Sequence, residues 1–269
     1  MSIIEKSVLT AEKRAQGTTQ PAEVPPKPAP ASQKKDTPSA AMAGQFDERP
    51  ADPVFVNQFR QLKRSILRAS FGPLAEPGAN LLIITSALPN AGKTFIAKNV
   101  AQALSHKRDR HVLLIDADNA KRTLTSALEL DDRPGFFDLL SDESLSIDEL
   151  IVRAPLPHLD VMPAGGRYTD SSELLSSRRA KAMISRLAQE DPDRLVIFDS
   201  PPLLATPDAP ALADAGGLFL LVVEAGATTR RDIEQALEIF GENNTVGLIL
   251  NKATKSSSSL LGYYGRHYG

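Results

Sequence analysis

The sequence predicts one doubly wound α/β domain with a mostly parallel sheet, placed between an N-terminal arm and a short C-terminal tail. Two patterns predict this fold. Short apolar runs without polar alternation are typical of strands buried on both faces of a parallel sheet. These runs alternate along the chain with segments of helical periodicity, which is the order of a βαβ fold. The chain of 269 residues is long enough for one large domain with extensions at both ends.

Residues 1–50 are expected to form an arm outside the domain. Residues 21–40, PAEVPPKPAPASQKKDTPSA, are rich in proline, alanine, serine and lysine and have almost nothing to bury. This composition predicts a disordered, partly polyproline-like linker. Residues 1–16 could form a short helix.

The domain is expected to span residues 51–255 and to begin with a helix. Asp52 suits an N-cap and Pro53 a first turn, apolar residues then recur at helical spacing, and Gly72 ends the helix. The expected strands are residues 81–85, 112–116, 159–163, 195–199, 218–223 and 246–250. The expected amphipathic helices between the later strands are residues 172–189 and 229–241.

Composition excludes several classes of protein. The formal net charge of -2 gives no broad electrostatic reason to expect a nucleic acid or a lipid surface as partner. Cysteine is absent, which excludes disulfides and thiolate metal sites and suits the cytoplasm. The N-terminus has no apolar core of a secretory signal, and no apolar run approaches the roughly 20 residues that cross a bilayer. Membrane association is therefore expected only through a partner.

A phosphate-binding loop is predicted where LLIITSALPNAGKTFIAKNV gives a strand, a loop and a helix in that order. In this context the loop N–H groups hold phosphate oxygens, Lys93 reaches the β- and γ-phosphates, and the Thr94 hydroxyl ligates Mg²⁺. Ala87 stands where the usual pattern has its first glycine. The predicted nucleotide-binding residues are Pro89, Asn90, Ala91, Gly92, Lys93, Thr94, Phe95 and Asn251.

The expected roles of Asn251 and Lys93 depend only on their positions in the sequence. Asn251 ends a predicted strand on the ligand side, where it could contact the adenine or could simply form a turn. Lys93 is expected to face solvent, because it lies on the loop and not in the core. A left-handed backbone is tolerated at Asn90.

Three aspartates are expected near the phosphate loop. Asp116 and Asp118 follow one buried strand, and Asp199 ends another. Ligands of open parallel sheets lie at the carboxyl ends of strands, so these side chains should converge on the loop. Carboxylates there could hold the magnesium of Mg·ATP and accept a proton from a hydroxyl group.

These motifs resemble the bacterial tyrosine kinases, which are phosphate-loop proteins, and in particular the exosortase-associated tyrosine autokinases of exopolysaccharide gene clusters. The resemblance covers residues 52–269 and includes TSALPNAGKTF, LLIDADNAK, MPAGGRYTDSSELLSS and VIFDSPPLL. It also includes the tail, residues 256–269, because three of the four tyrosines lie in the final seven residues. The resemblance implies that Tyr263, Tyr264 and Tyr268 are autophosphorylation sites.

The resemblance also implies roles and partners. Lys93, Asp116 and Asp118 would be catalytic, with the division of roles between the two aspartates open, and Thr94, Asp118 and Asp199 would hold Mg²⁺. The family packs subunits into a ring through a Glu-x-x-Arg-x-x-Arg helix, whose positions hold Asn57, Arg60 and Lys63 here. A homo-oligomer, protein tyrosine substrates and a membrane-embedded chain-length or activator protein are expected as partners. The chain would then be cytoplasmic and peripheral to the inner membrane.

Two alternatives remain open at this point. A partition- or septum-type ATPase has the same fold, but it carries a lysine at the position of Leu88 and has no reason for a tyrosine tail. The second alternative is a non-catalytic nucleotide-binding regulator of a polysaccharide chain-length protein, because the loop departs from the usual pattern at Ala87, Asn90 and Ala91.

Overall fold

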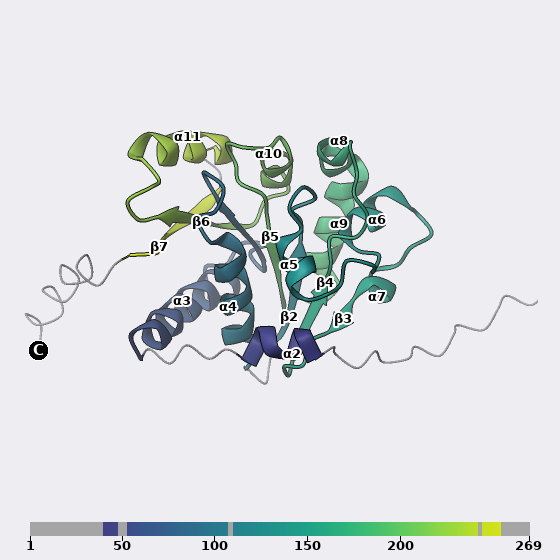
Figure 1. Ribbon diagram of the computed structural model, residues 1–269, viewed down its shortest axis with the longest axis horizontal. Helices are drawn as coiled ribbons and strands as arrows, with labels where there is room; N and C mark the ends of the chain where they lie inside the picture. The colour runs from purple at the N-terminus through teal and green to yellow at the C-terminus, as the bar shows by residue number, and fades with distance from the viewer. Residues whose placement is uncertain (1–39, 48–52, 107–109, 242–243, 254–269) are drawn as a thin grey trace, which may run out of the picture. The chain divides into compact units, whose positions relative to one another are not determined.

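The computed structural model describes residues 40–47, 53–106, 110–241 and 244–253. These residues form a sheet of seven strands in the order β3-β4-β2-β5-β1-β6-β7, which is parallel except for β3 (Figure 1). The strands are β1 Leu81–Ser86, β2 His111–Asp116, β3 Val152–Arg153, β4 Leu159–Met162, β5 Arg194–Asp199, β6 Leu218–Glu224 and β7 Thr245–Asn251. The predicted mostly parallel sheet is confirmed, and the two-residue β3 was not predicted.

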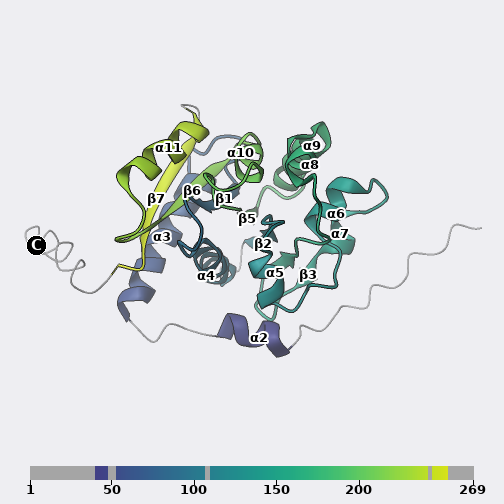
Figure 2. The same cartoon turned by 45° about the horizontal axis from the view of Figure 1, so that its top comes forward.

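Helices cover both faces of this sheet (Figures 1 and 2). On one face lie α2 Ala40–Asp47, α3 Pro53–Phe71, α4 Lys93–Ser105 and α5 Thr123–Ala127. On the other lie α6 Phe136–Ser141, α7 Ile147–Leu150, α8 Ser171–Ser176, α9 Arg178–Gln189, α10 Asp208–Ala213 and α11 Arg230–Phe240. None of the helices in these described ranges combines the length and the apolar character that crossing a bilayer requires.

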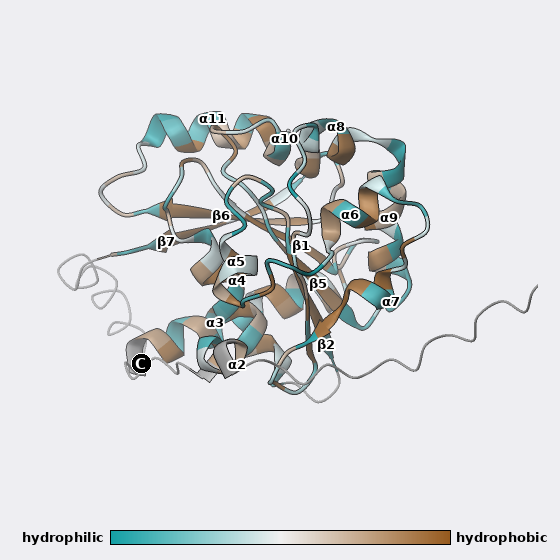
Figure 3. Ribbon diagram, turned by 45° about the vertical axis from the view of Figure 1, so that its right-hand side comes forward, coloured by the Kyte–Doolittle hydropathy of each residue, from teal (hydrophilic) through white to brown (hydrophobic). Residues whose placement is uncertain are grey.

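The central strands are apolar on both faces because each face has its own core. In β1, Leu81 and Ile83 belong to the core under α9 to α11, whereas Leu82 and Ile84 belong to the core under α3 and α4. Figure 3 shows this as hydrophobic colour along the strands and hydrophilic colour on outward-facing parts of the helices. The unbroken apolar runs therefore follow from burial on both sides.

Three sequence predictions need correction. The helix expected over residues 172–189 is broken at Ser177, whose backbone is extended at φ −66 and ψ 155. The Ser177 hydroxyl accepts a hydrogen bond from the Ala180 N–H at 3.0 Å, so it caps the start of α9. The chain therefore forms α8 and α9 as separate helices.

The second correction concerns β7, which was expected to be buried on both faces. It is an edge strand, and its Leu248 and Leu250 side chains are 57% and 58% exposed. An apolar run indicates a strand but does not say where that strand lies in the sheet.

The third correction concerns the arm, because residues 40–47 form helix α2 and pack against the domain. Met42 and Phe46 are each 1% exposed and belong to the core that α4 and α5 share. The Lys98 ammonium donates to the Gln45 side chain at 2.9 Å, and the Gln102 amide donates to the Phe46 carbonyl. Met42 and Phe46 lie four residues apart and so share one face of the helix. The predicted boundary at residue 50 is therefore wrong for this segment.

Candidate functional site

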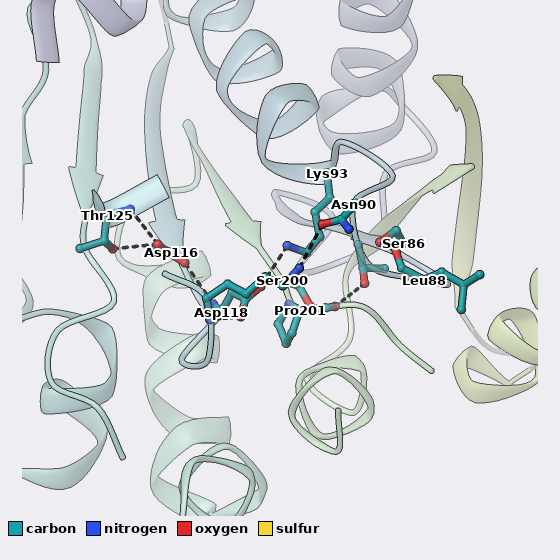
Figure 4. A network of polar contacts seen from close by, with 11 residues as sticks. Ser86, Leu88, Asn90, Lys93, Asp116, Asp118, Thr125, Ser200 and Pro201 are labelled. Carbon is teal, nitrogen blue, oxygen red and sulfur yellow. Dashed lines mark hydrogen bonds and ion pairs between the residues drawn. The ribbon is translucent and has the colours of Figure 1, made fainter. Parts of the chain in front are cut away.

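The candidate site lies where three adjacent strands end. β1 lies between β5 and β6, and β5 lies between β1 and β2. The sheet register pairs Asp116 at the end of β2 with Asp199 at the end of β5, and it pairs Asp199 with Ile84 of β1. The phosphate loop leaves β1 two residues further on, and Figure 4 shows Lys93, which follows this loop, paired with Asp118. The predicted convergence of the loop and the aspartates is confirmed.

The phosphate loop has the strained backbone that its shape requires. Asn90 and Gly92 adopt positive φ values of 68° and 92°. A Cβ atom on Gly92 would lie 2.2 Å from the Asn251 side-chain nitrogen, so only glycine fits there. That nitrogen donates to the Ala91 carbonyl at 2.8 Å, which fixes the loop to the end of β7. Asn251 therefore braces the phosphate loop in this structure.

The departure from the usual pattern at Ala87 is accommodated by packing. Its methyl group is buried in the core under α9 to α11. The Ser86 hydroxyl donates to the Leu88 carbonyl at 2.7 Å, and the Thr85 hydroxyl donates to the Pro201 carbonyl at 2.7 Å (Figure 4). The Ser86 hydroxyl thus holds the first half of the phosphate loop, and the Thr85 hydroxyl holds the segment that follows β5.

Lys93 is buried, contrary to the prediction that it faces solvent. It is the first residue of α4, is 7% exposed, and pairs with the Asp118 carboxylate at 3.0 Å (Figure 4). Burial by itself would lower the pKa of Lys93, but the negative charges of Asp199 and Asp118 outweigh it and raise that pKa. The ammonium is therefore charged and held among carboxylates.

Asp116 is held at both carboxylate oxygens by the chain that follows it. One oxygen accepts from the Thr125 N–H at 2.8 Å and from the Thr125 hydroxyl at 2.7 Å, and the other accepts from the Asp118 N–H at 3.1 Å. Burial raises the pKa of Asp116, although these hydrogen bonds oppose the shift. The Thr125 hydroxyl also accepts from the Ala164 N–H at 2.9 Å. Asp116 thus orients the loop that carries Asp118.

Asp199 has the properties expected of a carboxylate that binds a cation. It is buried, and neither of its carboxylate oxygens accepts a hydrogen bond of normal geometry within the described residues. Burial raises its pKa to about 7, while the Lys93 charge and the nearby Thr94 hydroxyl oppose that shift. A buried carboxylate without partners is costly unless a ligand satisfies it.

The donor set fits Mg²⁺ bound together with phosphate. The described residues contain no cluster of three or more His, Cys, Asp or Glu side chains arranged to hold a metal by themselves. Mg²⁺ commonly keeps water molecules and takes only one or two carboxylates beside substrate phosphates. Thr94, Asp118 and Asp199 would hold it here, with Asp199 supplying the unsatisfied oxygens.

Other predicted residues divide between the site and its surroundings. Pro89 is exposed on the phosphate loop. The Phe95 ring, 45% exposed, packs edge to face against Phe55 of α3 with ring centroids 5.8 Å apart, so it ties α4 to α3. The tail tyrosines lie outside the described residues.

Sequence reasoning missed a clamp between the loops after β2 and β4. The Asn119 amide donates to the Tyr168 carbonyl at 2.7 Å, and its oxygen accepts from the Tyr168 N–H at 3.1 Å. The Tyr168 hydroxyl donates to the Asp138 carboxylate at 2.7 Å. The only available signal was that Asn119 follows Asp118 directly, which does not reveal a partner 49 residues away.

The geometry of the site is that of a phosphate-loop nucleotide-binding protein, and comparison with known proteins agrees with it. A model of the AAA domain family matches residues 88–245. The tyrosine-protein kinase YwqD of Bacillus subtilis (strain 168) is 33% identical over 211 residues, 77% of this chain and 85% of that protein. The tyrosine-protein kinase ptk of Acinetobacter johnsonii is 30% identical over 210 residues, but these cover only 28% of that longer protein.

A solved structure supports the same assignment. The kinase domain of the Escherichia coli tyrosine kinase ETK matches with a TM-score of 0.66 and 26% identity, over 84% of this chain and 86% of that chain. The chain belongs to the bacterial tyrosine-protein kinases of the AAA domain family. The resemblance is therefore confirmed at the level of the family, and the exosortase-associated subgroup stays a prediction.

Proposed function

We propose that this chain is an ATP-dependent protein-tyrosine autokinase that phosphorylates Tyr263, Tyr264 and Tyr268. The observation that carries the proposal is the convergence of a phosphate loop with three carboxylates, in a member of a tyrosine-kinase family whose tail holds a tyrosine cluster.

In the proposed reaction, the bond between the β–γ bridging oxygen and the γ-phosphorus of ATP breaks and a bond from that phosphorus to the tyrosine oxygen forms. ADP leaves, and the phenol proton passes to a carboxylate. Bound Mg²⁺ would neutralise charge on the phosphates. Asp118 suits the role of acceptor better than Asp116, because its oxygen that pairs with Lys93 would be released when Lys93 turns to the phosphates, whereas both Asp116 oxygens are held by Thr125 and by the Asp118 N–H. Lys93 would move from Asp118 toward the phosphates.

We further propose that transfer occurs between subunits of a homo-oligomer formed through α3. Arg60 is exposed on this helix and suits a contact with another subunit. Lys63 suits it less, since its ammonium donates to the Ala103 carbonyl of α4 at 2.6 Å. Regulation of exopolysaccharide synthesis or export, docking on a membrane-embedded chain-length protein and a cytoplasmic, membrane-peripheral location follow from the resemblance and belong to this proposal.

A mixing experiment tests both the chemistry and the transfer between subunits. One variant, Lys93→Met, keeps the tail but lacks the phosphate-binding ammonium; the other keeps the site and has phenylalanine at the three tail tyrosines. Each variant alone, incubated with Mg·ATP, should contain almost no phosphotyrosine by mass spectrometry. The mixture should place phosphotyrosine on the tail of Lys93→Met.

The outcomes separate the alternatives. Phosphotyrosine on the triple phenylalanine variant at the wild-type level would place the acceptor elsewhere, and Tyr168 is the remaining tyrosine. Phosphate release from the wild type without phosphotyrosine would favour a partition-type ATPase. Nucleotide binding with neither product would favour a non-catalytic regulator.

A further inference from the structure

One lysine beside the phosphate loop has no acidic partner among the residues that the structure describes. Lys121 lies in the loop after β2, and its ammonium donates to the Asn90 side-chain oxygen of the phosphate loop at 3.1 Å. By contrast, Lys93 pairs with Asp118 at 3.0 Å, and Lys252 pairs with Glu224 at 2.9 Å. Within the described part of the chain Lys121 makes no ion pair, and the side-chain partner of its ammonium is the neutral amide of Asn90.

The backbone on both sides of this contact is fixed. The Lys121 N–H donates to the Asp118 carboxylate at 2.9 Å, which places Lys121 on the carboxylate side of the site. Asn90 has a φ of 68°, and its carbonyl accepts from the Lys252 ammonium at 2.7 Å. The flexible part of the contact is therefore the Lys121 side chain, which spans from one anchored loop to the other.

The contact itself is easily exchanged. Both Lys121 and Asn90 are exposed, and an exposed hydrogen bond between an ammonium and an amide contributes little because water can replace either partner. A phosphate oxygen is a stronger acceptor, since both groups are then charged. Phosphate bound to the loop would therefore compete with Asn90 for this ammonium.

The position of Lys121 indicates which phosphate it meets. Backbone groups of a phosphate loop hold the inner phosphates, and the terminal phosphate lies toward the carboxylates that carry out the chemistry. Lys121 approaches from that side, because its backbone is bonded to Asp118. A second ammonium there would also offset repulsion between the terminal phosphate and Asp116, Asp118 and Asp199.

We propose that Lys121 binds the γ-phosphate, leaving Asn90 when ATP is bound, and thereby makes the site prefer ATP over ADP. Without ATP, the Asn90 side chain keeps the Lys121 ammonium beside the phosphate loop. The inference rests on the proposed nucleotide site. It assigns this chain a triphosphate-sensing group outside the loop that carries Lys93.

Equilibrium binding of two nucleotides tests this assignment. The affinity for a non-hydrolysable ATP analogue and for ADP, each with Mg²⁺, is measured by calorimetry on the full chain. Lys121→Ala should weaken the analogue about tenfold, the loss of one charged phosphate contact, and change ADP less than about twofold. Lys121→Arg should retain most of the preference. Lys181→Ala, which removes the same charge from an exposed position on α9, should change neither affinity.

Asn90→Gly distinguishes direct binding of the phosphate by Lys121 from an indirect effect of Lys121 on the phosphate loop through Asn90. Glycine accepts the positive φ but removes the acceptor, so Lys121→Ala should weaken the analogue by about the same factor in the Asn90→Gly background as in the wild type. Equal weakening of both nucleotides by Lys121→Ala, or no weakening of either, would overturn the assignment while leaving the nucleotide site in place. A wild type that binds neither nucleotide would overturn the nucleotide site and this inference together.

Discussion

Replacing Asp199 with asparagine should change how the stability of the protein depends on pH. In the wild type, burial raises the pKa of Asp199 to about 7, above its ordinary value of 3.8. A carboxyl group whose folded pKa is raised stabilises the protein below its unfolded pKa, and this stabilisation is lost as pH rises through the folded pKa. Asp199→Asn has no such group to ionise.

The magnitude follows from the two pKa values. For an isolated carboxyl with pKa values of 3.8 unfolded and about 7 folded, linkage gives a loss of about 2.5 kcal/mol between about pH 5 and pH 8. The charge of Lys93 lowers the pKa of Asp199 and that of Asp116 raises it, so Asp199 does not titrate as an isolated group. We therefore expect the free energy of unfolding of Asp199→Asn, relative to that of the wild type, to increase by roughly 1–3 kcal/mol from about pH 5 to about pH 8.

Urea unfolding without nucleotide and with a chelator, at pH values across this interval, measures the difference directly. Asp214→Asn is a matched control for the removal of one carboxylate, because Asp214 is exposed at the end of α10. A constant difference between Asp199→Asn and the wild type would refute the account of Asp199 as a buried, unsatisfied carboxyl. Mg²⁺ should also tighten nucleotide binding less at pH 6 than at pH 8 in the wild type, because only the ionised carboxylate binds the ion.

Further substitutions test the contacts around the site and the packing of α2. Lys93→Met should lower the free energy of unfolding by roughly 3–5 kcal/mol at neutral pH, because it leaves the buried charge of Asp118 unpaired. Adding Asp118→Asn removes that charge and should restore part of the loss. Urea unfolding measures both effects. Thr125→Val should cost roughly 1–3 kcal/mol in the same assay and reduce phosphotyrosine formation, because Asp116 loses a hydroxyl donor. Phe46→Ala should lower the free energy of unfolding by roughly 3–5 kcal/mol, because its side chain is buried between α2 and the domain. An unchanged urea midpoint would show that α2 is not part of the core.

The local sequence determined most of the strands and the position of the phosphate loop. An apolar run such as residues 81–85 is typical of a strand in the interior of a sheet that is covered on both sides, and β1 is such a strand. The GKT segment after that run then fixes the start of a helix and its phosphate-binding end. The convergence of Asp116 and Asp199 could also be predicted, because parallel strands end at the same edge of their sheet.

Tertiary contacts decided the features that local patterns cannot carry. The apolar run of β7 looks like that of β1, yet only the strand order places β7 at the edge with Leu248 and Leu250 exposed. Lys93 looked like a surface charge, and it is buried because Asp118, 25 residues later, supplies its counter-charge.

The same reason applies to α2 and to the loop contacts. Met42 and Phe46 lie in a helix beside a proline-rich segment, and they are buried because α4 and α5 offer an apolar surface that the helix can cover. Asn119 and Lys121 acquire their roles from partners that the fold brings to them, namely Tyr168 and Asn90. A sequence determines local conformation through neighbouring residues, whereas burial and pairing between distant residues depend on the arrangement of the whole sheet.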